Sequence, residues 1–252
     1  MDFIAGYFGG LIGTVFSHPM DTVRIWTQTN KGSILENTHN IYKRGGLRQF
    51  YKGFYPPLLS ISLEKSIVFG VYSSIYNLNI IGNKHANILF SGYISGLSAS
   101  TFVAPLEAIK IEHQKSKHGT LHDKALKLYK NGRLYSSIVP TLFREPPGFA
   151  IYFYTYSRLN EYTLSNNEII NSFVYGSIAG CTSWLFIYPA DVVKTRIQLS
   201  NKPIIQTINE CINKRLLYKG FSLSIARAIP LHGGAFLGFT IVKKFEKDFI
   251  TH

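Results

Sequence analysis

Acidic residues are scarce in this chain of 252 residues: 14 Asp and Glu stand against 27 Lys and Arg, which gives a formal net charge of +13. Charged residues of both signs make up only 16% of the sequence, whereas hydrophobic residues make up 46%. Few charges with a large positive excess are unusual for a soluble globular protein. A nucleic-acid binder and a membrane protein with basic loops both fit this balance, so the placement of the charge must decide between them.

Cysteine is nearly absent as well, and the common motifs of catalysis are missing. Cys181 and Cys211 form neither a CxxC metal pattern nor a disulfide framework, so both are expected to be plain thiols. The sequence contains no Gly-rich phosphate loop, no GxSxG and no HExxH, and its eight histidines are scattered. We expect His18 and His232 to pack between helices or to line a cavity. The sequence therefore predicts no enzyme, no cofactor and no metal site.

Long uninterrupted apolar runs are also rare, but six interrupted ones are present. They are predicted to be membrane spans and lie at residues 3–27, 54–76, 86–112, 138–157, 169–195 and 221–242. Each is near the ~20 residues that cross a bilayer. Gly, Pro, Ser and a few charges interrupt them, which transporter helices tolerate where they face water or one another. No basic n-region and no Arg-rich leader precedes the first stretch, so no cleavable targeting peptide is expected.

Basic residues concentrate in alternate connectors between these stretches. Residues 29–52, 115–136 and 199–219 hold five, six and four Lys and Arg, whereas residues 77–85 and 160–168 together hold only Lys84. This asymmetry is typical of a membrane protein whose positive loops stay on one side. A nucleic-acid binder has no reason to alternate its charge in this way, so nucleic acid is not an expected partner.

The chain repeats itself at a period of about 85 residues. Each repeat contains the pattern P-x-[DE]-x-x-[KR], with a Gly nine residues before the Pro and a Gln four residues after the base. The Pro, acid, base and Gln of the three copies are Pro19, Asp21, Arg24 and Gln28; Pro105, Glu107, Lys110 and Gln114; and Pro189, Asp191, Lys194 and Gln198. Glycine pairs one helical turn apart would let helices approach closely. These pairs are Gly6 and Gly10, Gly92 and Gly96, and Gly176 and Gly180.

A second block follows the first in each repeat. It reads Tyr51-Lys52-Gly53 in the first copy, Tyr218-Lys219-Gly220 in the third, and a degenerate Tyr135-Ser136-Ser137 in the second. The repeating unit is thus a helix, a basic loop and a helix. The sequence predicts an all-α membrane protein, with six transmembrane helices in three pseudo-symmetric helix-loop-helix repeats. We expect one domain over residues 1–252, with repeats at 1–80, 81–164 and 165–252.

The first motif has a direct physical reading. A proline inside a helix removes one hydrogen bond and bends the helix, so kinks are expected at Pro19, Pro105 and Pro189. The acid and the base of each motif are three residues apart and share a helix face, so each helix can offer its acid to one neighbour and its base to the other. Three such helices can close a ring of ion pairs, each worth about 1 kcal/mol at a wet cavity floor.

The threefold motif, followed by an aromatic-basic-Gly block, resembles the mitochondrial carrier family over essentially the whole chain. The resemblance implies a monomeric solute carrier that works by alternating access in the inner mitochondrial membrane, with both termini toward the intermembrane space. It implies a matrix gate, braced by the glutamines, whose ion pairs are Asp21 with Lys110, Glu107 with Lys194, and Asp191 with Arg24. It also implies cardiolipin, as a structural lipid, near the turns at Tyr51, Lys52 and Gly53 and at Tyr218, Lys219 and Gly220.

The same resemblance leads us to look for a second gate, [FY]-[DE]-x-x-[KR], on the even-numbered spans. The acid positions of the three corresponding stretches hold Ser73, Ser157 and Thr240 instead. We therefore expect hydroxyl contacts, rather than ion pairs, to hold the matrix-open state.

A small asymmetric substrate cannot be bound by three identical faces, so aligned positions that differ between repeats are the candidate binding residues. Counted from the second block, the even-numbered spans present Ser60, Arg144 and Arg227 at one level, Glu145 one residue further and Glu64 a turn further. Ionisable side chains near the midplane are costly unless they face water or one another, so a substrate site is the first hypothesis. The alternative is that Arg144 and Glu145 form structural pairs with other helices.

The identity of these residues indicates the class of substrate. Arginine grips a carboxylate or phosphate with two parallel hydrogen bonds, and a glutamate suits a cation. By resemblance to carriers of ornithine, other basic amino acids and carnitine esters, Glu64 would hold a distal cationic group, Arg144 and Arg227 the carboxylate, and Glu145 the α-amino group. Trp184 can cap a cationic group or pack between helices. A nucleotide carrier is the alternative, and a proton leak or a non-transporting membrane scaffold ranks below it.

Overall fold

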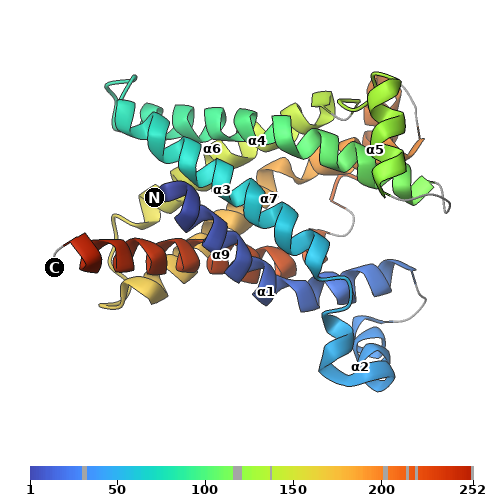
Figure 1. The fold of residues 1–252 in the computed structure, drawn as a ribbon, viewed down its shortest axis with the longest axis horizontal. Helices are drawn as coiled ribbons and strands as arrows, with labels where there is room; N and C mark the ends of the chain where they lie inside the picture. The colour runs from blue at the N-terminus through green and yellow to red at the C-terminus, as the bar shows by residue number, and fades with distance from the viewer. Residues whose placement is uncertain are drawn as a thin grey trace. The chain divides into compact units, whose positions relative to one another are not determined.

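The computed structural model describes residues 1–29, 33–115, 121–136, 138–200, 204–213, 216–218 and 221–250. Within these ranges the chain forms nine α-helices and no strand, in agreement with the predicted all-α fold. The long helices are α1 (Asp2–Thr29), α3 (Tyr55–Leu78), α4 (Lys84–Lys115), α6 (Ile138–Leu159), α7 (Glu168–Ser200) and α9 (Phe221–Ile250) (Figure 1). Each begins within two residues of a predicted span, and the ends extend a few residues further into the connectors.

Three short helices occupy the connectors that the sequence predicted as basic loops. They are α2 (Ile34–Phe50), α5 (Leu121–Lys130) and α8 (Ile204–Asn213). A capping box starts α2: the hydroxyl of Ser33 accepts the backbone N–H of Glu36 at 3.2 Å, and the Glu36 carboxylate accepts the N–H of Ser33 at 2.9 Å. The repeating unit is therefore a long helix, a short helix and a long helix.

Four of the described helices contain a segment that is long and apolar enough to cross a membrane. These segments are Tyr55–Leu78, Lys84–Ile109, Glu168–Lys194 and Phe221–Asp248. The other two predicted spans form helices of 28 and 22 residues, α1 and α6, without reaching the same hydropathy. Buried polar side chains account for this difference, among them Ser17 and His18 in α1 and Glu145 in α6.

The chain divides into two compact units that cut across the three repeats. Unit 1 comprises Met1–Gly70, Thr155–Trp184 and Gly220–His252, and unit 2 comprises Val71–Tyr154 and Leu185–Lys219. The boundaries fall inside α3, α6 and α7, so each unit contains parts of several long helices. The single domain of three repeats stays a prediction from the sequence.

The sequence predicted that the glycine pairs let helices approach closely, and in the structure each pair faces the next span of its own repeat. In unit 1 a Cβ added to Gly10 would lie 2.5 Å from the Cα of Ser62 on α3, and one added to Gly180 would lie 2.5 Å from the side chain of His232 on α9. In unit 2 a Cβ added to Gly96 would lie 2.6 Å from the Cα of Pro146 on α6. Any larger residue at these positions would push the helices apart.

The first and last helices also pack closely against each other in unit 1 (Figure 1). A Cβ added to Gly9 would lie 2.3 Å from the carbonyl oxygen of Ala235, and one added to Gly13 would lie 2.3 Å from that of Leu231. The later residue of α1, Gly13, faces the earlier residue of α9, Leu231, so the two helices run antiparallel. Sequence analysis singled out glycine pairs within repeats and missed this contact between the first repeat and the third.

Candidate functional site

A cluster of charged side chains in unit 2 centres on Arg144 of α6. Its Nη1 donates to Oδ1 of Asp191 on α7 at 2.8 Å, and its Nη2 lies 3.5 Å from Oε1 of Glu107 on α4. The same Nη2 is in close contact with the carboxylate of its neighbour Glu145. The Arg144 side chain is 19% exposed, so these contacts form where little water can screen them. Three carboxylates from three helices therefore converge on one guanidinium.

Glu107 holds two further partners in the same cluster. Nζ of Lys194 lies 2.6 Å from Glu107 Oε2, and the hydroxyl of Thr141 donates to that oxygen at 3.1 Å. Lys194 is only 3% exposed. The ion pair between Glu107 and Lys194 that the family resemblance implies is thus present, and Arg144 also contacts Glu107.

In this conformation the guanidinium of Arg144 already binds carboxylates of the protein itself. Sequence analysis offered two readings of this residue, a receptor for the substrate carboxylate and a partner in structural ion pairs with other helices. The second reading describes the contacts that are formed. The role of Arg144 in substrate binding stays a prediction, and a substrate carboxylate would have to replace Asp191, Glu107 or Glu145.

A second cluster lies in unit 1 around Arg227 of α9. Nε of Arg227 is 3.4 Å from Oδ1 of Asp21 on α1, and its guanidinium carbon lies 5.4 Å from the ring centroid of Trp184 on α7. The indole N–H of Trp184 donates to Nε2 of His232 at 3.3 Å. A guanidinium over an aromatic face gains from the negative charge of that face, more so when the pair is desolvated. Trp184 therefore packs against the cation that the sequence proposed for substrate binding.

His232 was expected only to pack or to line a cavity, but it orients Trp184. The ring nitrogen that accepts the indole N–H carries no proton, so the hydrogen bond selects the tautomer protonated on Nδ1. His232 is 8% exposed, and the absence of a side chain at Gly180 leaves room for its ring. Lys65 is buried at 3% exposure on α3 and was not considered in the sequence, although it stands next to Glu64.

One family model, described as mitochondrial carrier protein, matches the chain three times in succession, at residues 1–80, 82–167 and 165–248. The chain belongs to the mitochondrial carrier family. As a member of this family it is a multi-pass mitochondrial membrane transporter of small molecules, and not an enzyme.

Several curated carriers are similar to this one along nearly the whole chain. The mitochondrial arginine transporter of Arabidopsis thaliana is 28% identical, over 95% of this chain and 89% of the relative. The mitochondrial basic amino acids transporter of Rattus norvegicus is 28% identical, over 96% and 88%. The mitochondrial carnitine carrier of Saccharomyces cerevisiae is 26% identical, over 98% and 88%.

The remaining gate residues of this carrier are only partly described. Asp21, expected to pair with Lys110, contacts Arg227 in unit 1. The side chains of Lys110, Gln28, Gln114 and Gln198 lie outside the described part of the chain. Arg24 and Asp191 belong to different units, so their pairing stays a prediction.

The other predicted residues of the carrier are placed as follows. Pro19, Pro105 and Pro189 all lie inside continuous helices. The hydroxyl of Ser60 donates to the carbonyl of Pro56 at 2.9 Å, and Glu64 is half-buried one turn further along α3. Tyr51, Lys52 and Gly53 form an exposed turn after α2, where Gly53 has a φ of +78° that favours glycine. Lys219 and Gly220 lie outside the described residues, next to the exposed Tyr218.

Hydroxyl groups meet where the carrier lacks the acids of its second gate. Oγ1 of Thr240 and Oγ of Ser172 are 2.7 Å apart, and the ring of Tyr156 stacks on Phe236 at 3.5 Å. The base of that motif, Lys243, binds Asp2 at 2.9 Å and Glu246 at 2.7 Å instead. With no acid at position 240, Lys243 takes its carboxylate partners from α1 and from its own helix.

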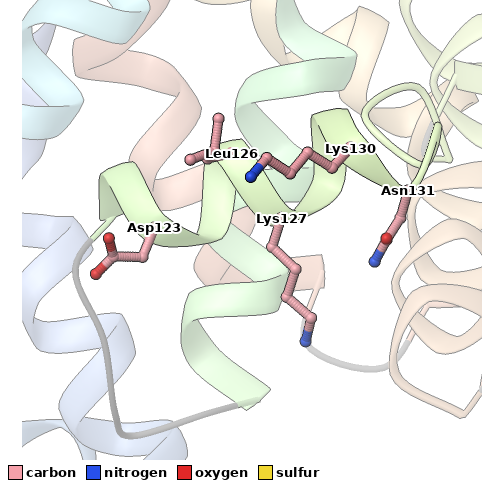
Figure 2. A pocket seen from close by; sticks show the side chains of 5 residues that line it. All are labelled: Asp123, Leu126, Lys127, Lys130 and Asn131. Carbon is pink, nitrogen blue, oxygen red and sulfur yellow. The ribbon is translucent and has the colours of Figure 1, made fainter.

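No cluster of three metal-ligating side chains occurs within the described residues. A cavity of about 300 Å³ opens along α5 and is lined by Asp123, Leu126, Lys127, Lys130 and Asn131 (Figure 2). None of these five residues belongs to the predicted substrate site or gate. The charged clusters around Arg144 and Arg227 are therefore the candidate functional sites of the carrier.

The hydrogen bond between Trp184 and His232 can be tested by substitution. His232→Leu removes the acceptor and leaves a buried indole N–H unsatisfied, which costs about 1–3 kcal/mol. We expect about a tenfold rise in the half-saturation concentration for the transported solute in proteoliposomes, with a smaller change in maximal rate. His232→Gln places an amide oxygen where it can accept the same N–H and should recover most of the affinity. Equal losses in the two variants would rule out the positioning role.

Proposed function

We propose that this carrier exchanges a basic amino acid, such as ornithine, lysine or arginine, or a carnitine-type zwitterion, by alternating access. The observation that carries the proposal is the meeting of guanidinium and carboxylate groups within membrane-spanning helices, around Arg144 and around Arg227. A substrate with a carboxylate and one or more cationic groups needs partners of both signs. A binding site with charged side chains of only one sign would leave either the carboxylate or the cationic groups of such a substrate unpaired.

Each candidate residue has a role in this proposal. Arg144 and Arg227 take the substrate carboxylate, because a guanidinium can bind it through two parallel hydrogen bonds. Glu145 takes the α-amino group and Glu64 the distal ammonium or guanidinium. Trp184 keeps Arg227 in place, and Ser60 offers a hydroxyl at the same level of the span.

The contacts of Arg144 suggest how binding couples to the gate. The substrate carboxylate competes with Asp191 and Glu107, the two acids that the repeat motif assigns to the matrix gate. A carboxylate that displaces them leaves Glu107 to Lys194, the base of the motif in the next repeat. Substrate occupancy and the ion pairing of the gate are thereby linked through one guanidinium.

The similar carriers support this class of substrate. One is an arginine transporter, one a transporter of basic amino acids and one a carnitine carrier. Arginine, the other basic amino acids and carnitine all carry a cationic group together with a carboxylate at neutral pH. At these identities the exact solute of the present chain is a separate question, which transport must decide.

We also propose an inner-membrane location with both termini toward the intermembrane space, a monomer, and cardiolipin near Tyr51 and Tyr218. The ion pair between Asp2 and Lys243 supports the placement of the termini, since it joins the first turn of α1 to the C-terminal half of α9. The Lys and Arg excess in the connectors that contain α2, α5 and α8 supports the opposite side for those connectors. Their basic side chains also suit anionic lipid.

Uptake into proteoliposomes tests the proposed substrate. Purified protein would be reconstituted with each unlabelled candidate inside and labelled arginine, lysine, ornithine, carnitine or ATP outside. We expect exchange of basic amino acids or carnitine that requires counter-substrate, and loss of that exchange in Glu64→Gln and Arg227→Ala. Arg158→Ala is the matched control, because Arg158 is 41% exposed and forms its ion pair with Glu161 of the next connector.

Two outcomes would count against the proposal. Exchange of ATP alone would assign the carrier to nucleotides and leave its fold untouched. Conductance without saturation or counter-substrate would favour a proton leak.

A further inference from the structure

Two prolines leave a backbone carbonyl without its helical partner. In an α-helix the N–H of each residue donates to the carbonyl four residues earlier, and proline has no N–H. Pro19 therefore leaves the carbonyl of Val15 unused in α1, and Pro189 leaves that of Leu185 unused in α7. Such a group is costly inside a membrane, because no water is available to satisfy it.

Two tyrosines reach these same two carbonyls. The hydroxyl of Tyr51 donates to the carbonyl oxygen of Val15 at 3.2 Å, and the hydroxyl of Tyr218 donates to that of Leu185 at 3.2 Å. Each tyrosine lies in the connection between the short helix and the second long helix of its repeat. The first and third repeats thus form the same hydrogen bond from the tyrosine of their shared Tyr-Lys-Gly block.

Ring contacts hold each tyrosine against the residue that precedes the proline. The ring of Tyr51 stacks on His18 at 5.9 Å, and the ring of Tyr218 stacks on Tyr188 at 6.0 Å. The interplanar angles are 29° and 22°. The rings approach their partners side by side, which directs both hydroxyls along the helix toward the carbonyl one turn before the proline.

The middle repeat has the proline but lacks this arrangement. Pro105 leaves the carbonyl of Thr101 unused, yet the residue before Pro105 is Ala104, which has no ring to stack on. Within the part of the chain that the structure describes, Tyr135 donates no hydrogen bond to Thr101. Tyr135 of the second repeat can therefore serve as a control for the hydroxyls of Tyr51 and Tyr218.

We propose that Tyr51 and Tyr218 are positioning residues of the matrix gate, because their hydroxyls replace the N–H that proline removes. Each tyrosine hydrogen bond stabilises the helix at the point where proline interrupts the backbone hydrogen bonds. The segment that follows carries the gate acid, Asp21 in α1 and Asp191 in α7. Both hydroxyls donate to backbone carbonyls of the proline-containing helices, so the inference concerns the gate and does not depend on which solute is carried.

Replacing each tyrosine by phenylalanine removes only the hydroxyl. In detergent-purified protein we expect Tyr51→Phe and Tyr218→Phe each to lower the melting temperature by several degrees. Backbone hydrogen exchange should rise locally around Pro19 in the first variant and around Pro189 in the second. Tyr135→Phe is the matched control and should leave both measurements unchanged. An effect of Tyr135→Phe as large as the other two would overturn the proposal.

Restoring the missing N–H supplies the decisive test. In a Pro19→Ala background the alanine N–H can satisfy Val15, so Tyr51→Phe should then have no further effect on local exchange. In a Pro189→Ala background Tyr51→Phe should keep its full effect, because Pro189→Ala restores a backbone N–H in α7 and leaves α1 unchanged. If Tyr51→Phe still raises local hydrogen exchange by the same amount in the Pro19→Ala background, the hydroxyl does not act through the carbonyl of Val15. If Pro19→Ala does not fold, the cycle of Tyr218→Phe with Pro189→Ala decides in the same way.

Transport separates positioning from binding. Exchange of the solute that the uptake experiment identifies should lose maximal rate in Tyr51→Phe while its half-saturation concentration stays within about twofold. The hydrogen-exchange results test the hydroxyl role even if neither amino acids nor carnitine are transported, so the two proposals can fail separately.

Discussion

Arg144→Ala is expected to abolish exchange and to destabilise the protein by about 3–5 kcal/mol, because it removes the cation on which three carboxylates converge. Glu107 would keep Lys194, but Glu145 and Asp191 would lose this partner in a site with little water. Counter-substrate exchange in proteoliposomes and thermal unfolding in detergent measure the two effects.

A second substitution distinguishes loss of charge balance from loss of a binding group. Arg144→Ala combined with Glu145→Gln removes one cation and one adjacent carboxylate, so it should recover part of the stability without recovering exchange. Arg144→Lys keeps the charge but loses the planar fork, and should retain stability better than transport. Wild-type exchange in any of these three variants would remove Arg144 from the proposed mechanism.

Gly13→Val is expected to prevent folding, and Gly13→Ala to cost about 1–3 kcal/mol or more. The reason is steric: the first side-chain atom at this position would lie 2.3 Å from the carbonyl oxygen of Leu231, and backbone cannot yield as a flexible side chain does. The yield of monodisperse protein in detergent and its melting temperature would report the effect.

Gly82→Ala serves as the control for this prediction. Gly82 lies in the connector between α3 and α4, and a Cβ added there would meet nothing within 4 Å. We expect its stability to stay within about 0.5 kcal/mol of the parent chain. If Gly13→Ala behaved like Gly82→Ala, the close approach of α1 and α9 would not be a feature of the folded carrier.

The long helices were predictable because the length of an apolar run and the period of the repeat determine them almost alone. The short helices were missed for the opposite reason: α2, α5 and α8 are polar connectors, and helix formation there depends on local signals. One such signal is present in the sequence, because Ser33 and Glu36 have the spacing of a capping box. The φ of +61° at Gly46 inside α2 had no comparable signature.

The charged residues were predictable, but their partners were only partly so. The repeat located Glu107 and Lys194, and the family resemblance implied that they pair. The repeat motif contains only positions that recur in every copy. It could not assign Arg144, which has no equivalent in the first repeat and reaches acids on two other helices. The role of His232 depends on how closely α9 approaches Gly180, and the sequence alone does not specify that distance.

The contact between α1 and α9 has a consequence for the biogenesis of the protein. The glycine face of α1 and the surface of α9 that covers it are separated by nearly the whole sequence, so α1 cannot bury this face until the last helix is in place. During that interval its exposed glycine surface is open to other helices, including those of another nascent chain. A chain that stops before α9 should therefore be recognised and degraded as unassembled, even though its earlier helices are intact.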